Sequence, residues 1–387
     1  MSRNRQIYQC DALLLNDGTD APNATIPSGN MLQLHRVQDG NFGYTIAKED
    51  VNQWGQLGRI DTVALTSPDV SADFTYFLHN LNNEVSLGFH VSNDFTESFT
   101  KNLLSSADTN PLKASVLSGR NYAILTSEEG LDANIQGFPE GNEASVISIG
   151  KAYLSDYSIE ASVGSIPTAS FSIKGSNQRS EVLTVPSGQV LEISSPFANE
   201  AGQAPTKMNV DVSATSVTMN PYVDNADPVL PSALRPGDIL LDLQDPSVLT
   251  DFSDALPGSS AHVQSFSMNI PFSRTPLERL GNTFAFAEEI DFPIQITVNI
   301  SAIVADLKSG SVFDELTNPT SNDLGITFKG KDGAAVMKYI IKDAQIESES
   351  LSQSIGSNKT VDLTFTAQVG GPNDVNAGVF VSGVALP

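Results

Sequence analysis

The side chains that most often carry catalysis or bind metals are few in this sequence and widely spaced. The four histidines are His35, His79, His90 and His262, and none belongs to an HxH or HExxH pattern. His79 lies within Phe74-TYFLHNLNNE, where a packed or hydrogen-bonded role is expected. No nucleophile elbow, Walker loop or dinucleotide fingerprint occurs either. These residues therefore predict no histidine-dependent or nucleotide-dependent chemistry.

Acidic residues offer two other kinds of chemistry. The carboxylate pairs Glu128-Glu129 and Glu288-Glu289 lie in polar surroundings, so solvated faces are the default interpretation. A glycosidase would need two inward carboxylates about 5 to 10 Å apart in a cleft. The loops Asn16-DGTD and Asp224-NAD could hold a hard cation through oxygen ligands, but neither matches the twelve-residue calcium loop. We interpret both as turns, and expect no metal, no cofactor and no enzymatic activity.

The composition predicts a β-rich chain with two domains. With 387 residues the chain fits two domains plus connections, and 40% hydrophobic residues are enough for real cores. Only 17% of residues are charged, and 28 Gly and 21 Pro favour turn-rich β structure over helix bundles. A mostly β chain with about one short helix in each half, and a Pro-rich segment between the halves, is therefore expected.

The charge balance and the single cysteine restrict partners and location. The 21 basic and 45 acidic residues give a formal charge of −24, which disfavours stable DNA binding. Cys10 is the only cysteine, so no intrachain disulfide or thiolate cluster is possible. The polar start MSRNRQIYQC lacks a signal peptide, and no run approaches the roughly 18 apolar residues of a membrane span. We expect a protein made in a reducing cytoplasm that has no membrane partner.

Strands are predicted by apolar residues at every second position. This alternation occurs at Ile294–Ser301, Val361–Ala367, Val85–Val91, Ala169–Ile173, Val210–Ala214 and Phe266–Ile270, and further strands are expected at Met208–Met219 and Asp238–Leu243. One helix is predicted over Asp94–Ser105, because Phe95, Phe99 and Leu103 recur at helical spacing. A second short helix is expected at Ser311–Leu316, within a counterpart region around Ala302–Leu316.

The sequence contains an internal duplication at a spacing of 192 residues. Gly150-KAYLSDYSIEASVGSIPTASFSI matches Lys342-DAQIESESLSQSIGSNKTVDLTF, with Gly164 falling on Gly356 at a Val/Ile-Gly-Ser turn. Glycine supplies a turn conformation that other residues reach only with strain. A weaker match relates Ile60-DTVALTSP to Val263-QSFSMNIP at a spacing of 203. Two similar β domains in one chain predict pseudo-symmetry within a ring.

The Pro-rich middle of the chain sets the expected domain boundaries. We assign residues 1–178 to a first β domain, residues 179–240 to a linker with the opening strands of the second domain, and residues 241–387 to the second domain. Trp54, within Val51-NQWGQLGR, is either an interface anchor or a core residue.

Two stretches carry a family resemblance. Leu34-HRVQDGNFGYTIAKEDVNQWGQLGRID and Ala72-DFTYFLHNLNNEVSLGF resemble the major tail-tube proteins of long-tailed bacteriophages. Those families share an aromatic-rich strand, an Asn-Glu pair and a Leu-Gly-Phe close. The corresponding residues here are Phe74, Tyr76, Asn83-Glu84 and Leu87-Gly88-Phe89, and the likeness continues at Tyr122-AILTSEEGLD, Ser145–Gly175 and Val336–Gly371. It covers most of the chain except roughly residues 175–261.

The resemblance implies two tandem tail-tube-like β-sandwich domains joined by a Pro-rich segment, and a structural virion protein rather than an enzyme. It implies a tube subunit that self-assembles as stacked rings, here as homotrimers with pseudo-sixfold symmetry. The implied partners are other tail proteins (tape measure, terminator, distal tail) and DNA in transient passage during ejection, and the implied location is the virion tail, assembled in the host cytoplasm. Acidic tube walls suit such passage. The residues expected to support assembly are Gly164, Gly356, Trp54, Phe95, Phe99 and Leu103. The Pro-rich middle is longer than a double tube domain needs, and wraps the ring exterior or joins successive rings.

Three other interpretations remain open. The chain could be another virion β protein, such as a tail terminator, a distal tail protein or a head decoration protein, which copy number in the virion would distinguish. It could be a carbohydrate-binding, adhesin-like β-sandwich, although one Trp and few Tyr offer little for an aromatic platform. It could be a glycosidase under the condition stated above.

Overall fold

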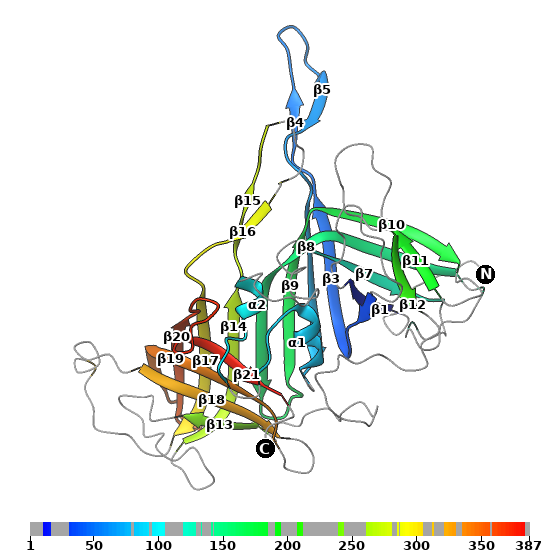
Figure 1. Cartoon of the computed structure of the whole chain (residues 1–387). Coiled ribbons are helices and arrows are strands. Elements are labelled where there is room, and N and C mark those ends of the chain that lie inside the picture. Colours follow the sequence, from blue (N-terminus) through cyan, green and yellow to red (C-terminus); the bar gives the residue numbers. More distant parts are fainter. Residues whose placement is uncertain are drawn as a thin grey trace.

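The computed structural model is built mostly of antiparallel β-strands (Figure 1). It describes residues 11–16, 31–78, 81–92, 95–104, 119–128, 133, 141, 143–184, 190–194, 207–211, 239–243, 261–280, 285, 287–304, 312, 321–329, 335–356 and 358–383. No helix within these ranges is long and apolar enough to cross a membrane. The expected β-rich, two-domain class is confirmed.

The strands fall into two sets that follow one another along the chain. The first copy contains β1 (Asp11–Asn16), β2 (Met31–Gln33), β3 (Val37–Thr45), β4 (Lys48–Val51), β5 (Asp61–Ala64), β6 (Asp69–Phe77), β7 (Arg120–Thr126), β8 (Glu143–Ser162), β9 (Thr168–Gly175) and β10 (Asn177–Thr184). The second copy contains β13 (Ile239–Leu243), β14 (Ala261–Pro271), β15 (Arg274–Leu277), β16 (Ala287–Ile290), β17 (Gln295–Val304), β18 (Ser321–Lys329), β19 (Ala335–Ser352), β20 (Thr360–Gln368) and β21 (Gly378–Ser382). Between them, β11 (Val190–Ser194) pairs with β12 (Lys207–Asp211).

The two copies share one pairing pattern. In the first copy the chain of neighbours is β1, β7, β8, β9, β6 and β3, and in the second copy it is β13, β18, β19, β20, β17 and β14. The pair β4–β5 also corresponds to β15–β16. Lys48 lies opposite Ala64 in the first pair and Arg274 lies opposite Ile290 in the second, and each residue of the second pair follows its counterpart by 226 positions. The duplication predicted from the sequence is thus present in the strand order.

Local irregularities repeat as well. Lys151 (φ 49°) and Asp343 (φ 57°), 192 positions apart, both adopt the left-handed region. The Asn121 Oδ1 accepts a hydrogen bond from the backbone N–H of Lys151 (3.2 Å), and the Asp323 Oδ1 accepts one from the backbone N–H of Asp343 (3.4 Å). Because positive φ is uncommon outside glycine, its repetition with the same side-chain support indicates a true structural repeat.

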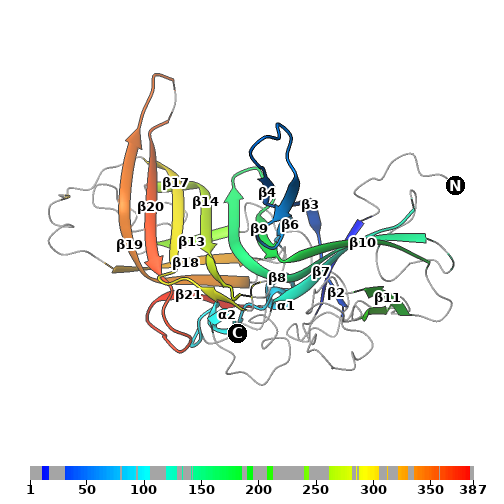
Figure 2. The same ribbon diagram turned by 90° about the horizontal axis from the view of Figure 1, so that it is seen from above.

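A long strand in each copy belongs to two layers. In β8, Ser145–Ala152 pair with β7 and Tyr153–Glu160 pair with β9. In β19, Ala335–Gln345 pair with β18 and Gln345–Ser352 pair with β20. Figure 2 shows β18 and β21 crossing beneath β14, β17 and β20. The change of layer coincides with register shifts at Ser155 and its counterpart Glu347, as expected because bulges bend and twist a strand.

The upstream half of the predicted repeat was aligned wrongly. Val263 on β14 lies opposite Ala302, just as Val37 on β3 lies opposite Tyr76, and a register shift follows in both strands. Val263 therefore corresponds to Val37 and not to Ile60. The misalignment arose because Ile60 begins a segment of similar polarity alternation, while Gly40 and Gly43 interrupt the alternation of β3.

Several predicted strands are confirmed, and one is wrong. The segments around Ile294, Val361, Ala169, Phe266 and Asp238 form β17, β20, β9, β14 and β13. The prediction at 208–219 is met only by β12, and residues 212–219 lie outside the described residues. Val85–Val91 is not a strand, because helix α1 (Asn82–Leu87) occupies its first part and ends at Gly88 (φ 102°). There the backbone N–H of Phe89 donates to the Glu84 carbonyl and closes the helix.

The helix predicted over 94–105 is also wrong for most of its length. Phe95 has a φ of 54°, which a right-handed helix does not allow, and helix α2 covers only Lys101–Leu104. The backbone N–H of Phe99 donates to the Val379 carbonyl (2.7 Å), so tertiary pairing with β21 replaces a helical bond. Asp94, Ser105 and nearly all of the second predicted helix at 311–316 lie outside the described residues.

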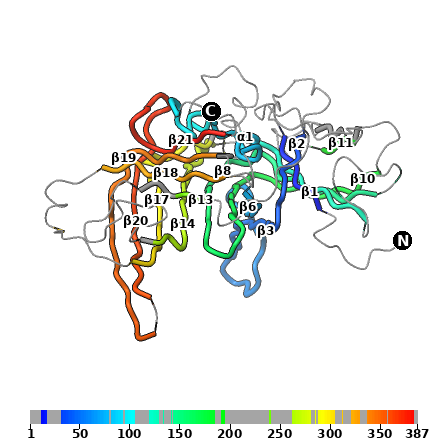
Figure 3. The backbone as a smooth tube through the Cα atoms, turned by 90° about the horizontal axis from the view of Figure 1, so that it is seen from below, coloured from blue at the N-terminus to red at the C-terminus, as the bar shows by residue number. Residues whose placement is uncertain are grey.

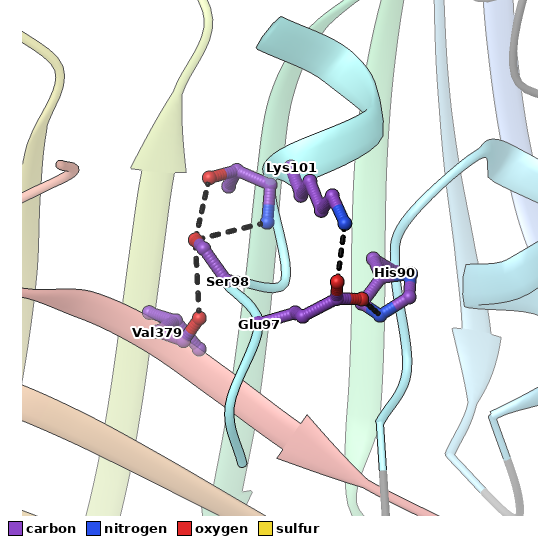
Figure 4. A network of polar contacts seen from close by, with 6 residues as sticks. His90, Glu97, Ser98, Lys101 and Val379 are labelled. Atoms are coloured by element: carbon purple, nitrogen blue, oxygen red, sulfur yellow. Dashed lines mark hydrogen bonds and ion pairs between the residues drawn. The ribbon is translucent and has the colours of Figure 1, made fainter. Parts of the chain in front are cut away.

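Polar contacts fix this segment to the second copy. The Ser98 hydroxyl donates to the Val379 carbonyl (3.5 Å) and lies 3.0 Å from the Thr100 hydroxyl (Figure 4). Within the segment itself, Glu97 lies between His90 (2.5 Å) and Lys101. The first copy's helical segment and the C-terminal strand are therefore held together.

One hydrophobic core spans both copies. Phe89 stacks on Phe99 with ring centroids 4.2 Å apart, and both rings lie near Tyr157 of β8. Phe272 of the second copy reaches Phe89 (6.0 Å), and Tyr339 reaches Phe99 (6.1 Å). The two copies are consequently packed against each other through a shared core and are not independent domains.

Candidate functional site

The junction between the two copies is a pair of strands. β14 of the second copy pairs antiparallel with β8 of the first, from Ser265↔Ser162 to Pro271↔Asp156. Backbone bonds continue on both sides, from Val163 N–H to the Gln264 carbonyl (2.9 Å) and from Phe272 N–H to the Ser155 carbonyl (2.9 Å). The inward side chains are fully packed: Phe266, Met268, Ile270, Tyr157, Ile159 and Ala161 are all buried.

The same two edges occur again towards the opposite ends of the chain, where no described strand lies beside them. The counterpart of β14 is β3, which among the described strands pairs only with β6. The counterpart of the second half of β8 (residues 153–162) is the second half of β19 (residues 345–352). In the described part of the chain, this half of β19 pairs only with β20. Figure 3 shows these open edges on separate parts of the molecule, with the β19–β20 hairpin projecting from the second copy.

Apolar side chains are exposed where the junction buries its own. Phe42 is 37% exposed and Tyr44 60% exposed on β3, whereas their counterparts on β14, Met268 and Ile270, are 1% and 0% exposed. On β19, Leu351 is 38% exposed, and its counterpart Ile159 is 1% exposed. Since unpaired sheet edges invite pairing with another chain, these strands form a candidate assembly interface.

The intrachain junction also supplies the register that such pairing would have. At the junction Met268 lies opposite Ile159, and their counterparts on the open edges are Phe42 and Leu351, which would face each other in the same way. Asn269 lies opposite Ser158, and their counterparts are Gly43 and Ser350. Gly43 has open space where a Cβ would lie, so this position tolerates a side chain.

Each copy bears a projecting two-stranded arm. The first arm is residues 46–66, around β4–β5, and the second arm is residues 272–292, around β15–β16; both extend to the same side of the molecule (Figure 1). At corresponding positions Trp54 is 103% exposed and Leu280 104% exposed. In the first arm Asp50 holds the strands together by accepting bonds from Arg59 (3.1 Å) and Thr62 (3.0 Å).

The base of the second arm is docked on the first copy around a cavity of about 600 Å³. The Lys151 ammonium on β8 donates to the Ala285 carbonyl (2.9 Å), and the Arg274 guanidinium lies over the Tyr153 ring (4.8 Å). Burial raises the pKa of Glu288, and the nearby Lys151 partly offsets this rise. The first arm has no such partner among the described residues.

A buried carboxyl group lies beside the junction. Glu84 on α1 is fully buried and accepts hydrogen bonds from the hydroxyls of Tyr76 (2.7 Å) and Tyr157 (3.1 Å). Burial raises its pKa to about 7, although both hydroxyls act in the opposite direction. Tyr157 belongs to the junction strand β8, so this group connects the core to the interface between copies.

The residues predicted to support assembly fall into different places. Gly164 (φ 87°) and Gly356 (φ 88°) adopt the expected turn conformation, the first beside the junction and the second beside the open edge of β19. Trp54 lies fully exposed at the end of the first arm, so it is not a core residue. Phe99 and Leu103 are buried in the chain's own core, and Phe95 is half-buried.

Sequence reasoning missed the residues that define the open edges. Phe42 and Tyr44 were not singled out, because Gly40 and Gly43 break the alternation of β3, and Leu351 was matched with Ile159 only as an apolar position of the repeat. Had Val263 been matched to Val37, the sequence repeat could have found them, since Phe42 and Tyr44 then fall on the buried Met268 and Ile270.

Comparisons with known proteins give weak likenesses. No protein-family model matches the sequence, and no curated protein matches it. Among solved structures, the tube-terminating cap of the anti-feeding prophage aligns over 42% of this chain and 98% of its own, at 10% identity and a TM-score of 0.28. A sheath–tube complex of an extracellular contractile injection system (PVC) aligns over 43% of this chain and 98% of its own, at 15% identity and a TM-score of 0.23. These neighbours are components of phage-tail-like assemblies, but TM-scores this low support no conclusion about this chain.

Proposed function

We propose that this protein is a self-assembling tail-tube subunit without enzymatic activity. The observation that carries the proposal is the repetition of one junction: β14 pairs with β8 inside the chain, and the equivalent strands β3 and β19 carry open edges. Pairing β3 of one chain with β19 of the next reproduces the junction between chains. Such a head-to-tail contact generates a ring if the rotation closes and a filament if it does not.

The resemblance to tail-tube proteins supplies the ring size and the setting. Three chains with two copies each give six equivalent modules per ring, and stacked rings make a conduit for DNA. The charge of −24 suits a wall that repels phosphates. The two arms leave the same side of the chain, so every module in a ring would present an apolar arm tip, such as Trp54, to the next ring.

The first test is the state of the purified full chain, by sedimentation velocity over a concentration series and by negative-stain electron microscopy. We expect rings or tubes with three chains per layer. A terminator protein would give single rings that do not stack, and a chain that remains a monomer at all concentrations would refute self-assembly.

A disulfide test then checks the register. In a Cys10→Ser background, Gly43→Cys with Ser350→Cys should cross-link neighbouring chains, because their counterparts Asn269 and Ser158 lie opposite each other at the junction. The matched control is Gly43→Cys with Leu351→Cys, which places the thiols on opposite faces of the paired strands. Equal cross-linking of both pairs would contradict the proposed register.

A further inference from the structure

We infer that the first arm docks on the second copy of the neighbouring chain, and that the change from Lys151 to Asp343 at equivalent positions of the two docking sites makes the copies alternate around the assembly. The inference rests on the proposed self-assembly and adds a second contact to it. Its basis is that the second arm already docks on the first copy, as the contacts around Lys151 show.

The equivalent positions are fixed by the register of the repeat. The docking site on the first copy uses Lys151 and Tyr153, whose counterparts on β19 are Asp343 and Gln345. On the arms, Arg274 corresponds to Lys48 and Ala285 corresponds to Arg59. Asp343 and Arg59 are both exposed in the chain, and Arg59 lies 3.1 Å from Asp50 of its own arm.

One charge at these positions changes sign, from Lys151 to Asp343, while the arm gains the cation Arg59 in place of Ala285 and keeps a cation at Arg274 and Lys48. Inside the chain a cation on the docking site, Lys151, meets the carbonyl of Ala285 and the acidic side chain of Glu288 on the arm. Between chains the docking site would present the anion Asp343, and the arm would present Arg59 at the position of Ala285. Thr62 replaces Glu288, so no arm carboxylate remains at that position to repel Asp343.

The other charged residues of the first docking site, three carboxylates and one lysine, have uncharged counterparts on the second copy. Asp69, Asp73, Asp156 and Lys174 line the cavity, and their counterparts Gln295, Asn299, Ser348 and Thr366 are uncharged. Asp343 is therefore one of two acidic residues at the second site. The other is Glu347, which occupies the position equivalent to Ser155 of the first site. Asp50 pairs with Arg59 (3.1 Å) and also accepts a bond from Thr62, so Asp343 would approach a cation that already has one carboxylate beside it.

This arrangement discriminates between right and wrong neighbours. A first arm placed on another first copy would bring Arg59 against Lys151, and a second arm placed on a second copy would bring Glu288 towards Asp343. At the positions of Lys151 and Asp343 both combinations juxtapose like charges, whereas the alternating combination pairs Arg59 with Asp343. Like-charge contacts are a general means by which interfaces exclude wrong partners.

A charge-swap cycle on the full chain tests the inference. Arg59→Asp and Asp343→Arg should each raise the concentration for half-assembly by about tenfold at low salt, and the double variant should restore it to within about threefold of wild type. Molar salt should reduce the effect of each single variant, because exposed charges are screened. Arg179→Asp is the matched control, because it reverses an exposed cation on β10, outside both arms and both open edges, and it should leave assembly at the wild-type concentration.

The outcomes separate this inference from the proposed function. If the single variants assemble like wild type while Gly43→Cys with Ser350→Cys still cross-links, strand pairing stands and arm docking is refuted. If both single variants lose assembly and the double variant does not recover, the two residues act separately and the pairing is refuted. If wild type neither assembles nor cross-links, self-assembly itself fails, and the inference fails with it.

Discussion

Replacing Tyr44 with serine should weaken assembly strongly while leaving the fold of the single chain intact. Tyr44 lies on the open edge of β3 and is 60% exposed, whereas its counterpart Ile270 is completely buried at the junction. An assembly that reproduces the junction must therefore bury most of the remaining tyrosine surface.

The size of the effect follows from this surface. If the side chain offers about 200 Å², 60% exposure leaves about 120 Å² to be buried, which is worth roughly 3 kcal/mol at about 25 cal/mol per Å². A loss of this size lowers an association constant roughly 100-fold. Phe42 is 37% exposed, so Phe42→Ser should cost about 2 kcal/mol by the same reasoning.

The assay is sedimentation velocity across a concentration series, with thermal unfolding of the dissociated chain as a check on folding. Val182→Ser is a suitable control, because Val182 is 66% exposed on β10, away from both open edges. We expect Tyr44→Ser to assemble only at concentrations at least tens of times higher than wild type, and Val182→Ser to match wild type. Assembly of Tyr44→Ser at the wild-type concentration would refute the equivalence of β3 with β14.

Three further predictions concern the buried carboxyl group, the turns and the arm tip. Because burial raises the Glu84 pKa from 4.5 to about 7, the folded chain binds this proton more tightly than the unfolded chain, so this contribution to stability is complete below pH 4.5 and lost as pH rises to 7. The stability of Glu84→Gln relative to wild type should therefore increase by about 3 kcal/mol between pH 4 and pH 8 in urea titrations, and a constant difference would contradict the buried, ionising carboxyl. Gly164→Val and Gly356→Val should each lower the free energy of unfolding by about 1 to 3 kcal/mol, since a β-branched residue is strained at positive φ, and each should impair assembly. Trp54→Ser should leave rings of normal size but shorten or abolish tubes in electron micrographs; normal tubes would show that the exposed tip has no part in stacking.

The sequence determined the class of the fold and the existence of the repeat. Alternation of apolar and polar residues located β9, β14, β17 and β20, because one buried face and one solvated face are enough to specify a strand. The Val/Ile-Gly-Ser spacing located both turns, because only glycine adopts the required φ without strain. These features depend on near neighbours along the chain, which a sequence displays directly.

The tertiary structure decided where local preference was overridden and which edges remain open. Phe95, Phe99 and Leu103 have helical spacing, yet pairing of the Phe99 backbone with β21 prevents a helix there. The open edge of β3 is visible only once β14 is seen paired with β8, since an edge is defined by the absence of a neighbour in space. The sign reversal from Lys151 to Asp343 likewise gains meaning only from the docked second arm, because electrostatic complementarity depends on distances that the chain order does not contain.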